Sequence, residues 1–455
     1  MQLIVRFFHP LSLSAKLIPL IFPFMKTIKV GIIGCGVVGS GVVRVLQENA
    51  KVIELRVGNK IEIAGVADRV FPKGVKIEKK IFTDDGFALC RNLEIDIIVE
   101  TVGGMGIAAE FIKTALENGK HVITANKALL SEKGFPLFQL ASKQKKLLLF
   151  EAAVGGAIPI IRTLKMDFAG EKITQMKGIL NGTCNYILTQ LTEGGIEFAD
   201  ALKAAQEKGY AEADPTLDIE GIDTAHKIAL MAMLAWGVKV DFKKIPITGI
   251  TKLTAADFDF AKRLNCVIKL LAVAKKEGKE IEIHVSPTLL PADSALAKIG
   301  GVINAVQIYG ENMESCLLSG RGAGSLPTAT AVVGDIIEAA RDTLVGKSAV
   351  PVCGYQPEKL VEFKMRKAGE ITNAYYLRFS VKDVPGVIRD ISTTLAKHKL
   401  SIHSFVQFAK PHPETFCPVV MVLHPAKLGE VQKAVAEIDK LRCVNQKTLI
   451  LPKLS

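Results

Sequence analysis

The chain has few of the residues that mark metal sites, disulfide frameworks and nucleic-acid surfaces. Its 455 residues include eight cysteines and one tryptophan, and aromatic residues make up only 6%. The cysteines stand singly, without a CxxC pair or a Cys/His spacing, so neither a zinc site nor a disulfide framework is indicated, and reduced thiols in the cytoplasm are expected. The net charge of +12 is spread along the chain without a nucleic-acid module. The charge therefore indicates a solvated surface with a pocket for an anionic cofactor, and no nucleic-acid partner.

Long apolar runs are also scarce, and the one at the start is interrupted. Residues 1–24 carry Arg6, His9, Lys16 and three prolines, which break any span across a bilayer. Because a small-residue cleavage site is missing as well, Met25 is expected to be the working start, in preference to a signal peptide over residues 1–24. No membrane partner is expected elsewhere in the chain.

The first ordered pattern is a strand, a glycine-rich turn and a helix. Residues 26–33 predict the strand, and Gly34, Gly36 and Gly39 form the pattern GxGxxG before a helix. In that context the glycines make a tight turn, admit a pyrophosphate and let the helix pack on the strand. Further strands are expected at residues 61–68, 95–101, 120–127 and 147–150. The pattern predicts a Rossmann nucleotide-binding domain.

The end of the second predicted strand leaves the cofactor open between NAD and NADP. Asp68 ends this strand, where an acidic residue binds the ribose 2′-hydroxyl of NAD. Arg69 follows at once, and Lys73 and Lys76 are close, so that a 2′-phosphate can be held instead. The sequence is compatible with NAD, with NADP or with both.

Two further features lie at strand ends, and each has two interpretations. Lys127 ends a strand after Thr124 and Asn126, which predicts an amine at the cofactor crevice or a solvated loop lysine. The link at residues 151–159 is rich in small residues. Its free carbonyls with one carboxylate can hold a hard cation, or the link is simply a tight crossover between domains.

The middle of the chain predicts an α+β domain with a charged pocket. Gly182 and Thr183 begin a helix whose free N–H groups suit a carboxylate. Residues 209–227 hold five carboxylates and one lysine, and they run into an apolar helix at residues 228–234. A charged loop that feeds a buried helix predicts a pocket for a small charged substrate. Residues 257–260 are expected on a solvated amphipathic surface.

The last part of the chain predicts a return helix and a separate small domain. The glycine-rich loop at residues 319–327 either reaches the cofactor or serves as a hinge, and the helix 328–340 is expected to pack against the Rossmann domain. After a charged linker at 355–372, the order strand, helix, strand, strand, helix, strand follows. This order is typical of the ferredoxin-like arrangement.

These motifs together resemble a family. The chain is similar to homoserine dehydrogenases with a C-terminal ACT domain. The resemblance covers residues 27–455 and is carried by Gly34–Gly39, Ala125–Lys127, Asn181–Thr183, Gly209–Lys227, Gly322–Gly324, Pro327–Ala329 and Asp383–Val387. It implies an α/β chain that interconverts L-aspartate-4-semialdehyde and L-homoserine with NAD(P), on the route to threonine and methionine. It also implies an amino-acid effector at the ACT domain, a homodimer or homotetramer, and no fused kinase.

The resemblance implies a role for each matched residue. Lys227 would donate the proton to the aldehyde oxygen, Asp223 would position Lys227, and Lys127 would contact cofactor and substrate and share the acid–base role. Glu212 would bind the substrate amino group and Asp218 would lie near the hydroxyl. The remaining substrate contacts would be Tyr210, Gly182 and Thr183. With the turn and strand end above, the candidate cofactor residues are Gly34, Gly36, Val37, Val38, Gly39, Arg69, Thr101, Lys127 and Gly322. The family's sodium site is matched by Glu151 and the carbonyls of Val154, Gly156 and Ile158.

The chemistry agrees with these roles. Reduction of an aldehyde develops alkoxide charge, which a nearby ammonium stabilises and protonates. A partly desolvated lysine near a second lysine is expected to have a lowered pKa. Asp223 and Lys227 also fit a surface ion pair worth about 0.3–0.5 kcal/mol, but the neighbours Ile222 and Ile228 argue against exposure. His226 is expected on the helix surface or supporting the site.

The expected domains are an extension at 1–24, a Rossmann domain at 25–150, a catalytic domain at 151–330, a return helix and linker at 331–371, and an ACT domain at 372–455. Two other functions compete with this interpretation. One is a different dehydrogenase on the same fold, with Cys184 as nucleophile, but Asn181–Thr183 favours a non-covalent reaction. The other is a ligand sensor that does not catalyse, which the acid and lysine set argues against.

Overall fold

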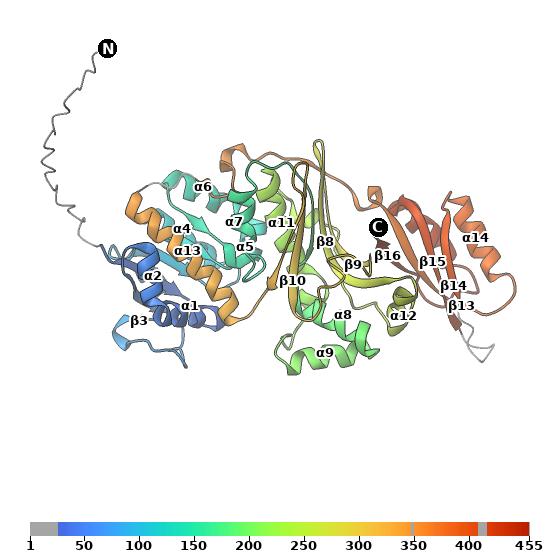
Figure 1. Ribbon diagram of the computed structural model, residues 1–455, viewed down its shortest axis with the longest axis horizontal. Coiled ribbons are helices and arrows are strands. Elements are labelled where there is room, and N and C mark those ends of the chain that lie inside the picture. The colour runs from blue at the N-terminus through green and yellow to red at the C-terminus, as the bar shows by residue number, and fades with distance from the viewer. Residues whose placement is uncertain (1–25, 347–349, 408–415, 455) are drawn as a thin grey trace, which may run out of the picture.

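The structure, a computed structural model, describes residues 26–346, 350–407 and 416–454. The expectation for residues 1–24 lies outside these ranges. Figure 1 shows an elongated molecule, with the N-terminal sheet and its helices at one end, a second sheet in the centre and the C-terminal unit at the other end. None of the described helices is long and apolar enough to cross a membrane.

The N-terminal part is a parallel sheet in the order β3-β2-β1-β4-β5-β6. Its strands are β1 (Ile28–Ile33), β2 (Ile61–Ala67), β3 (Phe82–Thr83), β4 (Ile97–Glu100), β5 (His121–Thr124) and β6 (Leu148–Leu149). Its helices are α1 (Val37–Glu48), α2 (Ala50–Val57), α3 (Gly86–Arg91), α4 (Ile107–Glu117), α5 (Lys127–Lys133) and α6 (Phe135–Gln144). Within β4, Ile97 and Val99 face one core and Ile98 faces another. Both faces of the sheet are covered, which explains the continuous apolar strands.

The strand order reverses direction between β1 and β4, which pair through Val30 and Ile97. In doubly wound sheets a crevice opens at this point, outside the carboxyl ends of the strands. The glycine turn after β1 and the loop after β4 both lie there. The predicted Rossmann fold is confirmed.

A second, mixed sheet runs through the rest of the chain in the order β11-β10-β7-β8-β9-β16-β13-β15-β14. Its central strands are β7 (Ile173–Ile179), β8 (Cys266–Glu277), β9 (Glu280–Pro291), β10 (Ile303–Gly310) and β11 (Glu314–Arg321). The helices of this part are α7 (Ile160–Arg162), α8 (Gly182–Gly194), α9 (Phe198–Glu207), α10 (Thr216–Ile219), α11 (Ile222–Trp236) and α12 (Ala255–Arg263). The sequence predicts β7 and the first half of β9 but misses β8, β10 and β11. Short apolar runs do not distinguish a buried strand from a helix.

The C-terminal unit has the predicted ferredoxin-like order. It comprises β13 (Thr372–Lys382), α14 (Val387–Lys397), β14 (Ile402–Gln407), β15 (Phe416–Lys427), α15 (Leu428–Ile438) and β16 (Leu449–Lys453). The expected linker contains β12 (Lys364–Met365), which pairs with β9. Because Lys453 of β16 also pairs with Leu289 of β9, the sheet continues from the central part into the C-terminal unit.

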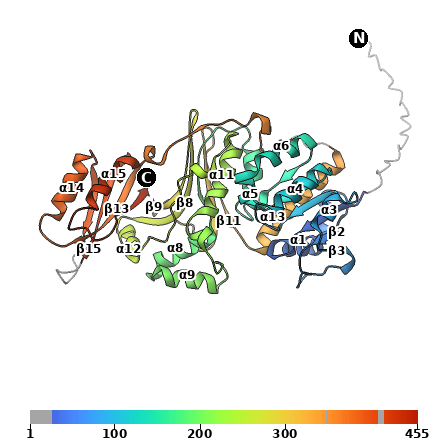
Figure 2. The same ribbon diagram turned by 180° about the vertical axis from the view of Figure 1, so that it is seen from behind.

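Helix α13 (Ser325–Val345) crosses back to the N-terminal part. Its buried residues Ala329, Val332 and Ile336 share a core with Val42 and Leu46 of α1. Figure 2 shows α13 beside α1 although more than half of the chain separates them. The return helix therefore closes one face of the parallel sheet.

One expectation about the central part is wrong. Asp257 on α12, predicted on a solvated surface, is fully buried, and Phe260 is 3% exposed. Asp257 accepts hydrogen bonds from the Tyr376 hydroxyl at 2.9 Å and from Arg378 Nε at 2.6 Å, both on β13. The amphipathic pattern was correct, but its polar face packs against the C-terminal unit. Asp257 ties this unit to the central part.

Lys269 on β8 is a buried cation beneath α8. Its side chain is 3% exposed, and its Nζ donates to the Ile299 carbonyl at 2.6 Å and to Asn185 Oδ1 at 3.2 Å. Burial lowers the pKa of Lys269 to about 8, although the charge of Glu193 opposes this shift. The lysine fixes α8, whose N-terminus faces the site described below. Burial of its charge lowers the free energy of unfolding by an amount that depends on pH.

Replacing Arg378 should destabilise the chain strongly. In Arg378→Met the buried Asp257 loses its cation, and breaking such a pair costs about 3–5 kcal/mol of unfolding free energy. Arg389→Met is the matched control, because Arg389 pairs with Asp390 on the same unit with its side chain 76% exposed. Exposed pairs contribute about 0.2–1 kcal/mol. Urea unfolding of the two variants measures the difference, and equal losses would contradict the buried tie.

Lys269→Met should change stability in a pH-dependent way. Below pH 8 the folded and unfolded lysines are both protonated, and the folded state bears the desolvation cost. As pH rises from about 8 to the ordinary value near 10.4, the folded lysine becomes neutral first and this cost disappears. The stability of Lys269→Met relative to the wild-type chain should therefore fall over this window by about 3 kcal/mol. Urea unfolding at several pH values tests this, and a constant difference would refute it.

Candidate active site

The glycine turn after β1 lies against the loop after β4. Gly34 has φ +90°, and a Cβ there would lie 2.8 Å from the carbonyl carbon of Thr101. The Thr101 hydroxyl donates to the Gly34 carbonyl at 2.6 Å. A Cβ on Gly39 would lie 2.0 Å from the Gly34 oxygen, whereas no atom of the described residues lies within 4 Å of a Cβ on Gly36. The turn leaves room for a phosphate at the N-terminus of α1, where Val37 is 72% exposed and Val38 follows.

The glycine-rich loop from the far end of the chain reaches the same helix. Ser325 Oγ donates to the Val37 carbonyl at 2.7 Å. A Cβ on Gly156 would lie 2.6 Å from the carbonyl carbon of Gly322, so the link after β6 touches this loop too. The loop that holds Gly322 therefore borders the predicted cofactor site, which favours the cofactor interpretation over a free hinge.

Asp68 anchors the glycine turn. Its carboxylate accepts hydrogen bonds from the Cys35 amide at 2.6 Å and from the Arg69 amide at 2.7 Å. Arg69 is exposed beside it at the end of β2. The acid and the base that leave the cofactor open between NAD and NADP are thus neighbours at this edge.

A buried carboxylate organises the loops at the ends of β4 and β5. Glu100 is fully buried, and its oxygens accept from the amides of Val102 and Gly103 and from the Thr124 hydroxyl. Asn126 caps α5 by accepting from the Leu129 amide. Thr124 and Asn126, which the sequence associates with function, hold the backbone that presents Lys127 at the start of α5.

Asp223 joins two lysines that come from helices in different parts of the molecule. Its carboxylate lies 2.6 Å from Lys227 Nζ, four residues later on α11, and 3.1 Å from Lys127 Nζ on α5. Lys227 also donates to the Leu180 carbonyl at 2.7 Å. The side chains of Asp223 and Lys227 are each 9% exposed, whereas that of Lys127 is 38% exposed. The pair at i and i+4 is therefore buried, which rules out the surface ion pair.

The charges around Asp223 favour the ionised forms of Asp223 and Lys127. Although burial alone would raise it, the pKa of Asp223 is lowered well below its usual range by Lys227 and Lys127. The pKa of Lys127 is raised because Asp223 is close, with smaller effects from Asp218 and Glu212. The expectation of a lowered lysine pKa is thus wrong for Lys127, because the carboxylates around it outweigh the effect of burial.

Asn181 connects the carboxylates to the N-terminus of α8. Its side-chain nitrogen donates to Asp218 at 2.7 Å and to Asp223 at 2.9 Å, and its oxygen accepts from the Cys184 amide. Burial raises the pKa of Asp218. Cys184 is fully buried and donates to the Asp218 carbonyl, and burial raises the pKa of its thiol, so it lacks the character of a nucleophile.

The rim of this cluster is formed by the residues before α10. Thr183 donates its hydroxyl proton to the Tyr210 carbonyl at 2.6 Å, which holds that segment against α8. The rings of Tyr210 and Tyr186 meet edge to face with centroids 5.1 Å apart. Glu212 is exposed, with its charge felt at Lys127. The structure thus brings together the predicted catalytic residues and the predicted substrate residues.

His226 supports this arrangement without touching the lysines' carboxylate. Its Nε2 lies 2.9 Å from Glu132 on α5, and its ring stacks on Phe242 with centroids 4.3 Å apart. The contact is a second tie between α5 and α11, beside the Lys127–Asp223 pair. The sequence predicts His226 either on the helix surface or supporting the site, and at 7% exposure it has the supporting position. Its partner is not predicted.

Asn304 on β10 is a residue that the sequence analysis missed. It is 1% exposed, and neither its oxygen nor its nitrogen has a hydrogen-bond partner within the described residues. A Cβ on Gly322 would lie 2.0 Å from its nitrogen, and one on Gly182 would lie 3.5 Å from its oxygen. The amide therefore lies between the loop beside the cofactor turn and the N-terminus of α8. A buried unpartnered amide carries no sequence signal.

The link after β6 is held by backbone hydrogen bonds. The two carboxylate oxygens of Glu151 accept from the amides of Ile161 and Arg162, both at 2.8 Å. The Glu151 amide donates to Asp335 on α13 at 2.9 Å. The Ile158 carbonyl accepts from the Ile160 amide, whereas within the described residues no hydrogen bond reaches the carbonyls of Val154 and Gly156. The carboxylate is thus already occupied, and the two free carbonyls remain the candidate cation ligands.

Three family models match the chain in consecutive blocks. Residues 34–151 match the NAD binding domain of homoserine dehydrogenase, residues 159–337 match homoserine dehydrogenase, and residues 375–439 match the ACT domain. The blocks correspond to the parallel sheet, the central part and the C-terminal unit.

Known proteins resemble the chain along most of its length. The homoserine dehydrogenase of Neisseria gonorrhoeae is 42% identical over 93% of this chain and 97% of its own. A crystal structure of the homoserine dehydrogenase from Thiobacillus denitrificans superposes with a TM-score of 0.88 at 37% identity, covering 95% of this chain and 99% of that one. A hyperthermophilic archaeal homoserine dehydrogenase in complex with NADPH has a TM-score of 0.60 at 26% identity, covering 70% of this chain and 98% of that one.

Substitutions of Gly36 and Gly39 should distinguish an effect on cofactor binding from an effect on stability. A methyl group on Gly36 meets open space, so Gly36→Ala should fold with stability within about 0.5 kcal/mol of the wild-type chain and bind NADH and NADPH more weakly. A methyl group on Gly39 meets the Gly34 oxygen, so Gly39→Ala should lose about 1–3 kcal/mol. Urea unfolding and fluorescence titration measure the two effects. Equal destabilisation by both substitutions would contradict this assignment.

Proposed function

The chain belongs to the homoserine dehydrogenase family, and from this premise we propose how its own residues carry out the reaction. It is an NAD(P)-dependent oxidoreductase that interconverts L-aspartate-4-semialdehyde and L-homoserine, on the route to threonine and methionine. The observation that carries the proposal is the pair of lysines on one carboxylate, Asp223. When bound, the nicotinamide supplies the hydride for the aldehyde carbon.

Lys227 is the proton donor to the aldehyde oxygen. An ammonium has three N–H groups, and two of those on Lys227 point at the Leu180 carbonyl and at Asp223. The third is left for the oxygen of the substrate. As alkoxide charge develops there, the fixed ammonium stabilises it and transfers the proton. Asp223 holds Lys227 in place and offsets its charge.

Lys127 has the supporting electrostatic role. Its raised pKa keeps it protonated and makes it a weaker acid than an unperturbed lysine. Its side chain is more exposed than that of Lys227 and begins α5, at the carboxyl edge of the parallel sheet. It therefore contacts both cofactor and substrate and stabilises negative charge without giving up its proton.

The rest of the pocket recognises an amino acid. The amides of Gly182 and Thr183 at the N-terminus of α8 bind the substrate carboxylate. Glu212, exposed on the rim, binds the substrate ammonium, and Tyr210 shapes the pocket beside it. Asp218, whose carboxylate Asn181 orients, lies near the substrate hydroxyl.

The nicotinamide cofactor lies over the glycine turn. Gly34, Gly36, Gly39, Val37 and Val38 form its phosphate site at α1, with Thr101 and Gly322 on either side. Arg69 supports binding of a 2′-phosphate, and Asp68 beside it supports a ribose hydroxyl. The likeness to an NADPH complex favours NADP, and NAD remains the alternative.

A sodium ion bound to the link after β6 is part of the proposal. The free carbonyls of Val154 and Gly156 fit a monovalent cation, with those of Glu151 and Ile158 beside them. The Glu151 side chain contributes charge from a distance, because both of its oxygens already accept backbone amides. The ion would fix the link between the two sheets and take no part in proton transfer.

The ACT domain supports regulation by an amino acid and assembly into a homodimer or homotetramer. In the described part of the chain, the second sheet ends in β11 and β14, whose outer edges support pairing between copies. We place the domains at residues 25–150, 151–330 and 372–455, with the return helix and linker at 331–371. The scattered thiols support a cytoplasmic location.

Measurements of turnover should distinguish the role of Lys227 from that of Lys127. Lys227→Met should lower kcat by roughly 10²–10⁴-fold because the proton donor is lost. Lys127→Met should lower kcat less and raise KM for both cofactor and aldehyde. Lys133→Met, on the exposed end of α5, is the matched control and should retain normal kinetics. Oxidation of NAD(P)H with aspartate semialdehyde measures all three, with circular dichroism to check folding. Near-normal turnover in Lys227→Met would transfer the donor role to Lys127.

A further inference from the structure

The side-chain amide of Asn304 is a buried polar group that the proposed mechanism leaves unused. Asn304 is 1% exposed, and within the described residues neither its Oδ1 nor its Nδ2 has a hydrogen-bond partner. The hydroxyls of Tyr186 and Thr224 are unpartnered as well, but neither of them offers a carbonyl oxygen and an N–H group side by side. Buried polar groups without partners destabilise a fold, and each calls for an explanation. A ligand that completes both hydrogen bonds would supply one.

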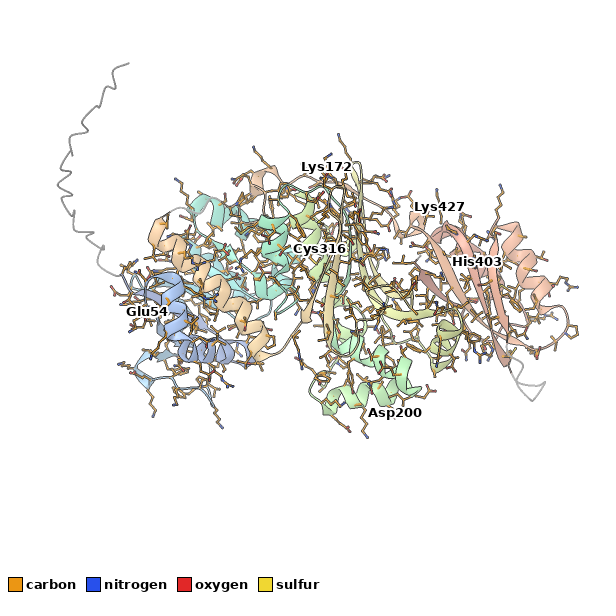
Figure 3. All side chains as sticks on the ribbon, viewed as in Figure 1. Glu54, Lys172, Asp200, Cys316, His403 and Lys427 are labelled. Atoms are coloured by element: carbon orange, nitrogen blue, oxygen red, sulfur yellow. The ribbon has the colours of Figure 1, made fainter. Side chains whose placement is uncertain are left out.

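The backbone holds this amide in a fixed place. Asn304 on β10 pairs with Gly320 on β11, and Asn185 of α8 donates to the carbonyl of the preceding residue, Ile303, at 2.9 Å. Strand β11 is the edge of the second sheet that lies nearest the N-terminal part, as Figure 3 shows at Cys316 of this strand. The amide therefore belongs to the border between the two sheets.

The amide lies between the proposed cofactor site and the proposed substrate site. On the cofactor side, a Cβ on Gly322 would lie 2.0 Å from Nδ2. The loop that holds Gly322 is joined to the N-terminus of α1 by the hydrogen bond from Ser325 to the Val37 carbonyl. On the substrate side, a Cβ on Gly182, the first residue of α8, would lie 3.5 Å from Oδ1. A group that reaches Asn304 is therefore within reach of both sites.

One layer of backbone covers the amide on the cofactor side. Gly322, against which Nδ2 lies, is partly exposed, and its neighbours Arg321 and Ala323 are exposed. Because Gly322 has no side chain, a displacement of this loop by one layer of atoms uncovers the amide. Binding at Asn304 thus requires a small shift of the loop and no rearrangement of the core.

We propose that Asn304 binds the carboxamide of the nicotinamide, with Nδ2 donating to the carboxamide oxygen and Oδ1 accepting from the carboxamide nitrogen. The inference rests on the proposed function, because it assigns a contact to the cofactor of that reaction. A primary amide satisfies both atoms of Asn304, since it offers an acceptor and a donor. The substrate offers a carboxylate, which suits only Nδ2, and an ammonium, which suits only Oδ1. In the proposed function these two groups already bind α8 and Glu212.

The position of Asn304 fits the chemistry of the ring. The carboxamide is attached to the ring carbon beside the one that exchanges hydride with the substrate. The group that binds the carboxamide must therefore lie where cofactor and substrate meet, as Asn304 does. Two hydrogen bonds from a side chain fixed in a sheet orient the ring toward the aldehyde carbon.

An analogue of the cofactor tests this contact in the wild-type chain. In the 3-acetylpyridine forms of NAD⁺ and NADP⁺, a methyl group replaces the carboxamide nitrogen, so Oδ1 loses its donor while Nδ2 keeps its acceptor. Calorimetric titration of the full-length chain should give a Kd about fivefold higher for the analogue than for the matching natural cofactor, because one hydrogen bond is missing from the complex. Equal Kd values would overturn the inference.

Two amides on β10 give a matched pair of variants. Asn304→Ala removes the proposed contact and adds no bulk against Gly322. Gln307→Ala removes an amide from the opposite face of the same strand, because residues three apart on a strand point to opposite faces. In Asn304→Ala the ratio of the two Kd values should fall to within about twofold of one, whereas Gln307→Ala should keep the wild-type ratio. Circular dichroism checks that both variants fold.

Other roles for Asn304 give different results. If Asn304 only supported the fold, Asn304→Ala would weaken binding of the natural cofactor and of the analogue equally and keep their ratio. If it bound the substrate, KM for L-homoserine would rise while the ratio stayed the same. Either result would overturn the inference. Reduction of aspartate semialdehyde by the wild-type chain is assayed separately, so a chain that reduces the aldehyde without preferring the carboxamide would leave the proposed function intact.

Discussion

The buried carboxylate of Asp223 is the interaction on which the site depends. It accepts from Lys227 on its own helix, from Lys127 on α5 and from Asn181 at the N-terminus of α8. Two cations and an amide hold its pKa low despite burial, so it is ionised at every working pH. Removing it would leave two lysines with like charges close together. The carboxylate therefore fixes both the charge balance of the pocket and the distance between the cofactor side and the substrate side.

The fold is arranged so that this carboxylate can be buried. Helix α11 is buried along its whole length from Asp223, because apolar residues surround it and the acid and lysine enter with it. Gly221 adopts φ +83° before it, which turns the chain from the acidic segment into the core. From the other side, Glu100 orders the loops that present Lys127. Each partner of Asp223 is thus positioned by different local contacts. A small displacement of any one partner weakens the interactions that the others make with Asp223.

Local sequence patterns predict much of the fold and of the site. They do not predict contacts between residues that are far apart in the chain. The glycine turn, the buried helix with Asp223 and Lys227, and the ferredoxin-like order each follow from periodicity and spacing within a short window. The burial of Asp257 did not, because the group that pairs with it, Arg378, lies more than a hundred residues away. The pKa of Lys127 was misjudged for the same reason, since its direction depends on which charges surround it. The partner of His226 and the orphan amide of Asn304 are also properties of assembled neighbours.

Three ion pairs lie where the parts of this molecule meet. Lys127–Asp223 joins the parallel sheet to the central part, Arg162–Asp335 joins the central part to the return helix, and Arg378–Asp257 joins the ACT unit to α12. Apolar contacts at these joints would tolerate sliding, whereas an ion pair out of water is stable only in a narrow range of geometry. Each of these ion pairs therefore lowers the stability of the fold but fixes the position of the two parts that it joins. For an enzyme whose acids come from one part and whose cofactor lies on another, defined position is what the reaction requires.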